Sequence, residues 1–413
     1  MSEVEDRPTL FPRSMELFER AARVIPGGVY GHTSPAVNLP LRSPYFAARA
    51  EGCRYWDVDG REYIDLMCAY GPNVLGYNHP EVESAAAQQR AAGNAFNHPT
   101  ERMVELAERL CALIDFADWG VFGRNGSDMT TWALSVAREA TQRKKVLKVK
   151  GAYHGVDPWC TPGHGGLIEE DRAHIHEFAW NDLDSFNELM RTHAGQVAAV
   201  ILTPFHHPAF GDSVLPADGF LPGIEAACRR EGSLLILDDI RAGFRLHLSG
   251  SHRAFGFTPD IACYCKALAN GYPISAAVGA HPLRVAASRV FLTGSYWNNA
   301  VPMAAALKTL ELIEGTQAIE TMRQRGKQLF DGLRALGERY EKPFVLSGPP
   351  AMPYVRFAHE NDFRDLQTFC AACMEHGLFL HPHHNGFLCA AHTEADITEA
   401  LQRTDSAFRQ VFG

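Results

Sequence analysis

Ser233-Leu-Leu-Ile-Leu-Asp238 is the stretch that decides the fold: a short apolar run that ends in an acid. Four apolar residues between polar ones predict a strand that is buried on both faces, and such strands belong to parallel sheets covered by helices. In open sheets of this kind, ligands collect beyond the carboxyl ends of the strands. Asp238 is therefore expected at the edge where a ligand binds.

A lysine follows in a second apolar segment, Ile261-Ala-Cys-Tyr-Cys-Lys-Ala267. An apolar setting lowers the pKa of a lysine amine toward the uncharged form that makes a Schiff base with an aldehyde. An acid such as Asp238 can keep a pyridine nitrogen protonated, so that the ring acts as an electron sink. Lys266 and Asp238 together predict pyridoxal phosphate chemistry. A structural ion pair between them is the alternative that their spacing leaves open.

Strands and helices alternate from about residue 100 to residue 310. This alternation predicts an α/β fold with a mainly parallel sheet and helices on both faces. The expected strands are Gly120–Phe122, Val146–Val149, Ala198–Thr203, Leu234–Leu237 and Ala276–Gly279, and the expected helices include Met129–Thr141, Pro222–Glu231 and Val301–Glu314.

A chain of 413 residues predicts two packed domains. We expect residues 1–50 to form an N-terminal segment, with a helix at Ser14–Val24, that packs with the small domain. Residues 51–315, which begin with a hairpin turning at Asp59-Gly60, would form the large cofactor-binding domain. Residues 316–413 would form the small C-terminal domain.

Composition excludes several classes of function. The net charge of −9 and the absence of a basic run argue against nucleic-acid binding. The acidic start, Met1-Ser-Glu-Val-Glu-Asp-Arg, predicts no secretion signal, and no stretch has the ~18 uninterrupted apolar residues of a membrane span. Ten scattered cysteines fit reduced thiols, so a cytoplasmic location is expected. Cys370 and Cys373 lie in an expected amphipathic helix, which favours core packing over zinc binding.

Arg124-Asn-Gly-Ser-Asp-Met129 joins an expected strand to an expected helix, whose apolar positions are Met129, Trp132, Ala133, Val136 and Ala137. Gly126 would let the backbone approach a ligand closely, and the free N–H groups at the helix start suit a phosphate. Capping of the helix by Ser127 or Asp128 is the structural alternative. Asp128 argues against a phosphate unless its side chain turns back to cap the helix.

Gly151-Ala-Tyr-His-Gly155 follows another expected strand. The Tyr153 ring could stack on a flat cofactor, and His154 beside it could orient the substituents of that cofactor. Core packing of the pair is the alternative that the segment leaves open.

These segments and others in the same order resemble the class III aminotransferases of the fold-type I pyridoxal-phosphate enzymes, and most of all the glutamate-1-semialdehyde aminomutase branch. The likeness spans nearly the whole chain. Besides the phosphate-loop, Tyr-His-Gly, acid and lysine segments, it includes Val24-Ile-Pro-Gly-Gly28, Tyr55-Trp-Asp-Val-Asp-Gly60, Gly71-Pro72, His79-Pro80 and Ala391-His-Thr-Glu-Ala-Asp-Ile397.

The resemblance implies a sheet of the seven-stranded type and a set of roles. Lys266 would carry the cofactor as an internal aldimine, and Asp238 would bind the pyridine nitrogen. Ile240 and Tyr153 would pack on the two ring faces, near His154. Gly126, Ser127 and Asp128 would form the phosphate loop. In this family a hydroxyl residue reaches the phosphate across a dimer interface, and Ser295 stands in that place, which implies a homodimer.

The chain also departs from the family pattern. Tyr296 and Trp297 stand where the aminomutases have a small, glycine-rich loop. The late arginine that grips a substrate carboxylate in many members is not evident, and Arg42 and Arg356 are both candidates for that role. Arg241 and Arg245 could be structural cations. Five histidines could bind a metal, but their pattern lacks a carboxylate and favours a substrate pocket, so no metal site is expected: His206, His207, His381, His383 and His384.

The sequence thus predicts an aminotransferase that moves an amino group from an amine or amino acid to a keto acid in two half-reactions. Lys266 would carry the proton between the substrate carbon and the cofactor. Three alternatives stay open: an aminomutase that moves the group within one molecule, a racemase or epimerase on the same fold, and a cofactor-binding protein without activity.

Overall fold

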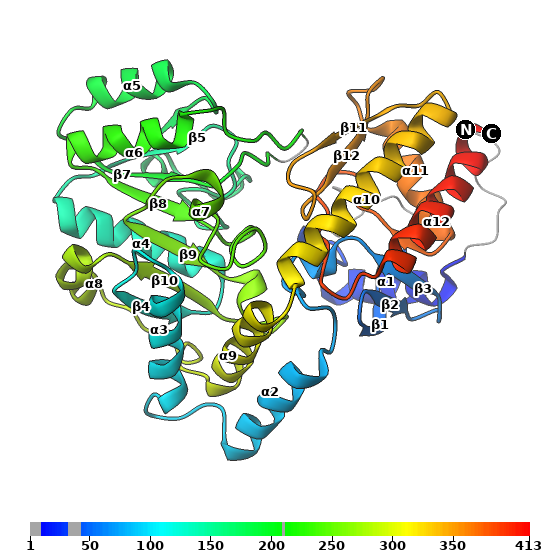
Figure 1. The fold of residues 1–413 in the computed structure, drawn as a ribbon, viewed down its shortest axis with the longest axis horizontal. Coiled ribbons are helices and arrows are strands. Elements are labelled where there is room, and N and C mark those ends of the chain that lie inside the picture. Colours follow the sequence, from blue (N-terminus) through cyan, green and yellow to red (C-terminus); the bar gives the residue numbers. More distant parts are fainter. Residues whose placement is uncertain (1–9, 32–42, 209–210) are drawn as a thin grey trace. The chain divides into compact units, whose positions relative to one another are not determined.

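The computed structural model describes residues 10–31, 43–208 and 211–413. This part of the chain divides into two compact units (Figure 1). One comprises the described residues up to Tyr70 together with Gly76–Asn78 and Thr321–Gly413, and the other comprises Gly71–Leu75 and His79–Glu320.

The larger unit is built on a seven-stranded sheet in the order β4-β10-β9-β8-β7-β5-β6. The pairs β9–β8, β8–β7, β7–β5 and β5–β6 are parallel, whereas β10 runs antiparallel to both of its neighbours. The sheet is therefore mainly parallel, as predicted. Its strands are β4 (Trp119–Gly123), β5 (Lys145–Val149), β6 (Ile175–Phe178), β7 (Val197–Leu202), β8 (Leu234–Asp238), β9 (Ile261–Tyr264) and β10 (Ser275–Gly279).

Continuous apolar strands sit at the centre of this sheet because helices cover it. All six residues of β7 are buried, as are the last four of β8. Helix α4 lies against strands β4, β7, β8, β9 and β10 through the predicted apolar positions, which are all buried. The helices of this unit are α2 (Pro80–Ala92), α3 (Glu101–Leu113), α4 (Gly126–Thr141), α5 (Leu183–Thr192), α6 (Phe220–Glu231), α7 (His252–Phe255), α8 (Arg284–Arg289) and α9 (Ala300–Gly315).

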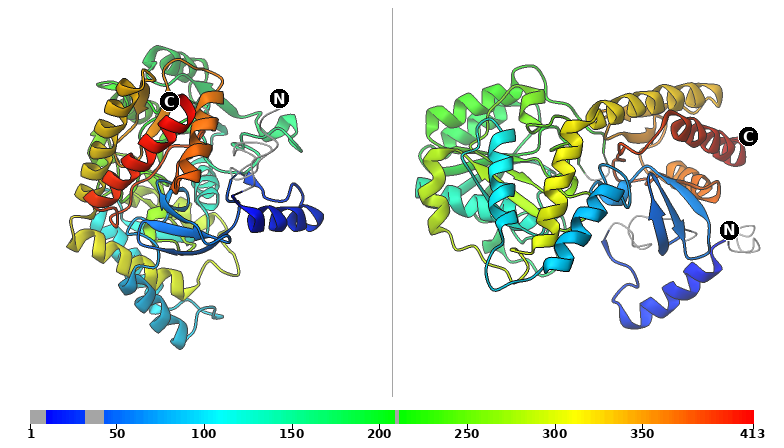
Figure 2. Two further views of the ribbon diagram at one scale, coloured as in Figure 1. Left: turned by 90° about the vertical axis from the view of Figure 1, so that its right-hand side faces the viewer. Right: turned by 60° about the horizontal axis from the view of Figure 1, so that its bottom comes forward.

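Helices α2 and α9 lie side by side although about 200 residues separate them in the sequence (Figure 2). The contact is anchored at its end by Asn94, whose backbone carbonyl accepts the N–H of Ala300 and whose side chain accepts the N–H of Val301. These two bonds satisfy amide groups at the start of α9 that have no partner within the helix.

The smaller unit joins the two ends of the described chain. Its four-stranded sheet has the order β1-β2-β3-β13, and β13 pairs in parallel with β3, so that Leu378 lies opposite Ile64. The elements here are α1 (Pro12–Val24), β1 (Ala47–Glu51), β2 (Arg54–Asp57), β3 (Glu62–Asp65), β11 (Phe344–Ser347), β12 (Tyr354–Phe357), α11 (Arg364–Glu375), β13 (Leu378–Phe379) and α12 (Glu394–Phe412), with α10 (Ala318–Arg339) entering from the larger unit.

The hairpin predicted at Asp59-Gly60 is confirmed as β2 and β3. It groups with the C-terminal residues because β3 hydrogen-bonds to β13. The boundary expected at residue 51 therefore differs from this division, whereas the one expected at residue 316 lies close to it. Phe11, just before α1, packs with Tyr63 and Met374. No helix in the described ranges is both long and apolar enough to cross a membrane.

Candidate active site

The acid predicted at the end of a buried strand lies at the centre of the large sheet. Asp238 is the last residue of β8, and its side chain is only 6% exposed. One carboxylate oxygen lies 2.8 Å from Nδ1 of His154, and the other accepts the backbone N–H of Ile240 at 3.2 Å. Two donors thus hold this carboxylate in a fixed direction, and they offset part of the cost of burying its charge.

Lys266 lies at the same edge of the sheet, directly after the neighbouring strand β9. Burial, followed by the nearby Arg241 guanidinium, lowers the pKa of its amine to about 8. A sizeable fraction of the amine is then uncharged near neutral pH, as a nucleophile requires. The lysine backbone has a φ of 24° at the start of a short 3₁₀ turn, a conformation that few non-glycine residues adopt.

The loop before α4 packs directly against the residue that follows the acid. A Cβ atom at Gly126 would clash with Cδ1 of Ile240, so a larger residue at this position would require the Ile240 side chain to move. Ser127 presents its hydroxyl to the next segment, where the oxygen accepts the N–H of Val156 at 3.1 Å. The loop and the Tyr153–Val156 segment therefore form one wall beside Asp238.

The Asp128 side chain turns back to cap its own helix, which is the arrangement that the sequence requires if the loop is to accept a phosphate. Its carboxylate accepts the backbone N–H groups of Arg124 and Asn125, each at 2.8 Å, and completes a capping box with Asn125. Asp128 therefore shapes the loop, and its charge is already engaged by these two amides.

Tyr153 and His154 both join this site. The Tyr153 ring lies 5.7 Å from the Arg241 guanidinium, and burial raises the pKa of the phenol. His154 is held by its bond to Asp238, by a nearly parallel Trp159 ring at 6.1 Å, and through its carbonyl, which accepts from the Thr130 hydroxyl at 2.8 Å. Its other ring nitrogen, Nε2, is buried and has no hydrogen-bond partner within the described residues.

These residues fit pyridoxal phosphate. The group carries a phosphate, a pyridine nitrogen and an aldehyde, and the edge of the sheet offers a glycine-containing helix start, a buried carboxylate and an amine with a lowered pKa. The close approach at Gly126 and the buried, unpartnered Nε2 of His154 are features that folding alone does not require.

Ser295 is the one predicted site residue that the described chain does not bring to this cluster. It is exposed, in the loop that precedes α9. The adjacent Tyr296 lies with its ring 5.2 Å from the Arg124 guanidinium, so the loop does reach the start of the phosphate-loop segment.

The sequence did not predict that Arg241 and His207 lie close to this site. Burial lowers the pKa of Arg241 to about 10, and it lowers the pKa of the buried His207 well below its usual value, with Arg241 acting in the same direction. Both residues follow the end of a strand, where the alternation of side chains no longer predicts which way a residue faces. Arg245, by contrast, is fully buried and donates to the carbonyl of Gly71, as a structural cation would.

Four other sequence candidates belong to the smaller unit. His381, His383 and His384 belong to the smaller unit, where the His384 ring meets that of Tyr70 at 5.2 Å. Arg356 is also in that unit and donates to the carbonyl of Phe357. Arg42 falls outside the described residues.

Residues 38–404 match the family described as Aminotransferase class-III. The chain is 46% identical over 399 residues to the aminopentol aminotransferase of Sphingopyxis macrogoltabida, covering 97% of this chain and 94% of that protein. It is 32% identical over 448 residues to a glutamate-1-semialdehyde 2,1-aminomutase of Chloroflexus aurantiacus, covering 99% and 98%.

Among solved structures, the fold matches the PLP internal aldimine form of the FumI protein of Sphingopyxis sp. MTA144 with a TM-score of 0.95 and 46% identity, over 97% of this chain and 96% of that one. The predicted family, fold type and cofactor class are confirmed. The chain belongs to the class III aminotransferases and is a pyridoxal-phosphate-dependent aminotransferase of fold type I.

Proposed function

We propose that this aminotransferase moves an amino group from a primary amine or amino acid to a keto acid in two half-reactions, with Lys266 as the proton carrier and Asp238 as the partner of the pyridine nitrogen. One observation carries the assignment. Asp238, held by His154, and Lys266, whose pKa is about 8, end or follow adjacent strands at the same edge of the large sheet.

Each part of the cofactor has a proposed holder. Gly126 and Ser127, with the N–H groups at the start of α4, would bind the phosphate, in a loop that Asp128 shapes. Ile240 and Tyr153 would flank the ring. Asp238 would accept a hydrogen bond from the ring nitrogen, and His154 would keep its carboxylate directed there. When bound, pyridoxal phosphate supplies an electron sink for the electrons of the broken C–H bond.

The chain then moves a proton. The neutral Lys266 amine would take the proton from the substrate carbon that bears nitrogen and would return it to the C4′ carbon of the cofactor. Such a transfer requires a base with a pKa near the working pH. Burial and then Arg241 favour the uncharged amine, because burial disfavours any charge and a neighbouring cation disfavours a second positive one. His207 has a depressed pKa and stays neutral, so it can line the site without adding to the positive charge.

For the amino donor we propose an amine on a hydroxylated alkyl chain. The support is the 46% identity to an aminotransferase whose name states an aminopentol. The exposed Tyr296 and the neighbouring Trp297 suit a substrate with a long chain better than a compact amino acid, because they offer broad contact surfaces. The acceptor would be a small keto acid such as pyruvate.

We further propose that the enzyme acts as a homodimer in the cytoplasm, with Ser295 completing the phosphate site of the neighbouring subunit. The exposure of Ser295 supports this role, because a residue that serves a partner must be accessible on its own subunit.

The assignment is tested by comparing the visible absorption band of the bound cofactor in the wild type and in Lys266→Ala. Purified wild-type protein mixed with pyridoxal phosphate should gain the visible absorption band that a lysine-bound cofactor has, and an amine donor should bleach it. Lys266→Ala should lose both the band and turnover. Lys150→Ala, which removes an exposed lysine in the same unit, should retain both. A wild-type protein without the band, or a Lys266→Ala variant with normal turnover, would overturn the assignment.

A second candidate is amino transfer within one molecule, which the similarity to the aminomutase favours. An aminomutase needs no separate acceptor. Product formation from the amine should therefore require added pyruvate or 2-oxoglutarate if the enzyme is a transaminase. Multiple turnovers of glutamate-1-semialdehyde without an acceptor would instead assign the aminomutase reaction.

A further inference from the structure

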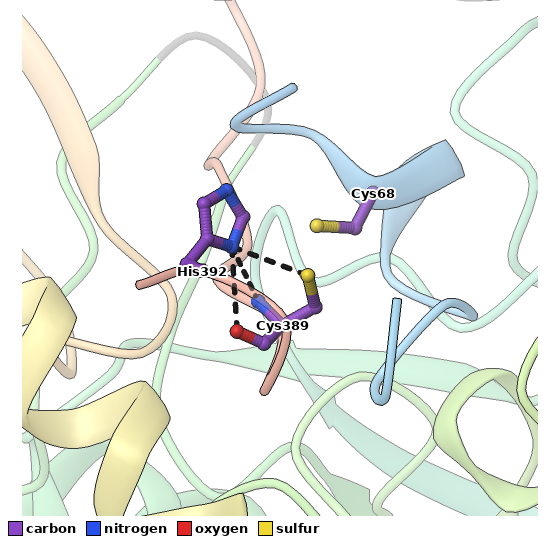
Figure 3. A group of neighbouring side chains, drawn as sticks. All are labelled: Cys68, Cys389 and His392. Atoms are coloured by element: carbon purple, nitrogen blue, oxygen red, sulfur yellow. Dashed lines mark hydrogen bonds between the residues drawn. The ribbon is translucent and has the colours of Figure 1, made fainter. Parts of the chain in front are cut away.

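Three potential metal ligands meet in the smaller unit, and none of them has a role in the proposed amino transfer. The side chains of Cys68, Cys389 and His392 point toward one another (Figure 3). Each residue is only 1% exposed, and their ligand atoms all lie within 4.8 Å of one another. Within the described ranges, no other group of at least three histidine, cysteine or acidic side chains has this arrangement.

The local backbone is built to bring the three together. Cys68 opens a turn in which three successive residues, up to Tyr70, have positive φ values of 48°, 54° and 66°. Its thiol lies 3.3 Å from the carbonyl of Phe387, in the segment that carries the other two ligands. Left-handed backbone at three non-glycine residues is costly, so this turn has to be held by the contacts it makes.

Cys389 and His392 form a compact Cys-x-x-His turn just before α12. The His392 N–H donates to the Cys389 carbonyl at 3.1 Å, and Nδ1 of His392 lies 3.2 Å from the Cys389 sulfur. Nδ1 also accepts the Cys389 N–H at 3.0 Å, so this nitrogen carries a lone pair and no proton. An unprotonated imidazole nitrogen is the form that binds a metal, and the ion would take over that lone pair.

The thiol chemistry points the same way. The sulfur atoms of Cys68 and Cys389 are both buried and lie within 4.8 Å of each other. Thiolates are the metal-binding form of cysteine. A buried thiolate needs a positive partner, and a divalent ion at the centre of the group would supply one.

The distances suit zinc. With Zn–S of about 2.3 Å and Zn–N of about 2.0 Å, ligand atoms of a tetrahedral ion lie roughly 3.5 to 3.8 Å apart. The observed 3.2 Å between sulfur and nitrogen, and the limit of 4.8 Å for the whole group, bracket this range. Small side-chain rotations would therefore bring all three atoms onto one ion.

We propose that Cys68, Cys389 and His392 bind one thiophilic metal ion, Zn²⁺, which ties the turn after β3 to the segment before α12. The role is structural: the ion would stabilise the smaller unit and take no part in amino transfer. It would leave one coordination position for a fourth ligand, as sites with three protein ligands do.

The chain contains a matched control. Cys370 and Cys373 form a Cys-x-x-Cys pair that is equally buried and lies in the same unit, but both sit within α11 and belong to no group of three ligands. Replacing one of them by serine removes a buried thiol without touching the proposed site.

The test uses reduced, cofactor-loaded protein that has been dialysed against EDTA. Titration with Zn²⁺ against a chromophoric chelator should give one ion per chain, and Co²⁺ should give the near-ultraviolet sulfur-to-cobalt charge-transfer band. Cys389→Ser and Cys68→Ser should weaken zinc binding by more than about 100-fold, whereas Cys370→Ser should bind as the wild type does.

Two results would overturn the proposal. One is a wild-type protein that binds no zinc and shows no charge-transfer band with cobalt, an outcome that does not depend on whether any variant folds. The other is a Cys68→Ser/Cys389→Ser variant, folded by circular dichroism, that still binds one ion with unchanged affinity. The absorption band of the cofactor serves as an independent check that the larger unit is intact in every sample.

Discussion

At the scale of single residues, the site depends on the placement of charge around one amine. Lys266 lies near Arg241, Arg245 and Asp238, and burial is the largest cause of its lowered pKa. Arg241 is the next largest, and it opposes a charge on the amine. Burial also disfavours the charge of the Arg241 guanidinium itself and lowers the pKa of this group to about 10. Arg241 thus helps to keep the amine nucleophilic.

This placement predicts a pH dependence. The rate at which pyridoxal phosphate binds the cofactor-free enzyme should rise with pH and level off above about 8, because only the uncharged amine reacts. Arg241→Met removes a neighbouring cation, so the amine should hold its proton more tightly and the midpoint should move to higher pH. The growth of the visible band after mixing, followed across a pH series, measures the midpoint.

Arg253→Met is the control, because that arginine is exposed and pairs with Asp115. Its midpoint should match that of the wild type. A midpoint that stays the same or falls in Arg241→Met would show that Arg241 does not act on the amine.

At the scale of elements, the start of α4 shows how a capping residue can serve a binding loop. Asn125 and Asp128 cap the helix, and the Asp128 carboxylate holds the N–H groups of Arg124 and Asn125. The amides of Gly126 and Ser127 are thereby positioned at the helix start, next to Ile240. The Asp128 carboxylate stabilises the loop through these hydrogen bonds, and the backbone N–H groups at the helix start remain available to an anion.

We expect Asp128→Ala to lower the free energy of unfolding of the cofactor-free protein by about 1 kcal/mol, the usual effect of losing a cap. It should also weaken cofactor binding, because the loop loses its fixed shape. Asp128→Asn keeps one oxygen acceptor and should lose less of both. Urea denaturation and a cofactor titration measure the two effects. Equal losses in the two variants would contradict a hydrogen-bonding role for this side chain.

At the scale of the whole molecule, each unit joins parts of the chain that are distant in sequence. In the smaller unit β13 pairs with β3, and in the larger one α2 packs along α9. The proposed dimer would extend this pattern, because Ser295 is exposed beside Tyr296, whose ring meets Arg124.

Mixing two inactive variants tests whether Ser295 serves its own subunit or a neighbour. Lys266→Ala removes the amine, and Ser295→Glu places a negative charge where the phosphate would be contacted, so each variant alone should lack the visible band of the lysine-bound cofactor. If Ser295 acts across the interface, a mixed dimer contains one intact site, with the lysine from one chain and the serine from the other. Refolding the two variants together should then restore up to half of the visible band.

The matched control is each variant refolded alone, with light scattering to establish that dimers form. No recovery in a confirmed mixed dimer would assign Ser295 to its own subunit, and a monomeric wild-type enzyme would remove the proposed dimer altogether.

Local patterns predicted much of this molecule. The apolar run before Asp238 predicted a buried strand that ends in an acid, and β8 confirms it. The segment before Lys266 was expected only to be apolar, and the structure shows that it forms the strand β9. The hairpin, the apolar face of α4 and the loop at Gly126 were also predicted, because strand and helix periodicity and glycine placement are local properties.

The sequence by itself determined the family and the large sheet, and it supplied the residues that we propose carry the chemistry. Only the tertiary structure decided which of them touch: His154 meets Asp238 across 84 positions, Arg241 faces the lysine, and Cys68 meets Cys389 across more than 300. The helix that the sequence predicted around Cys370 and Cys373 is confirmed as α11, and both residues are buried in it. The physical reason is that periodicity reports which face of an element is apolar, whereas contacts between distant segments depend on how the elements pack.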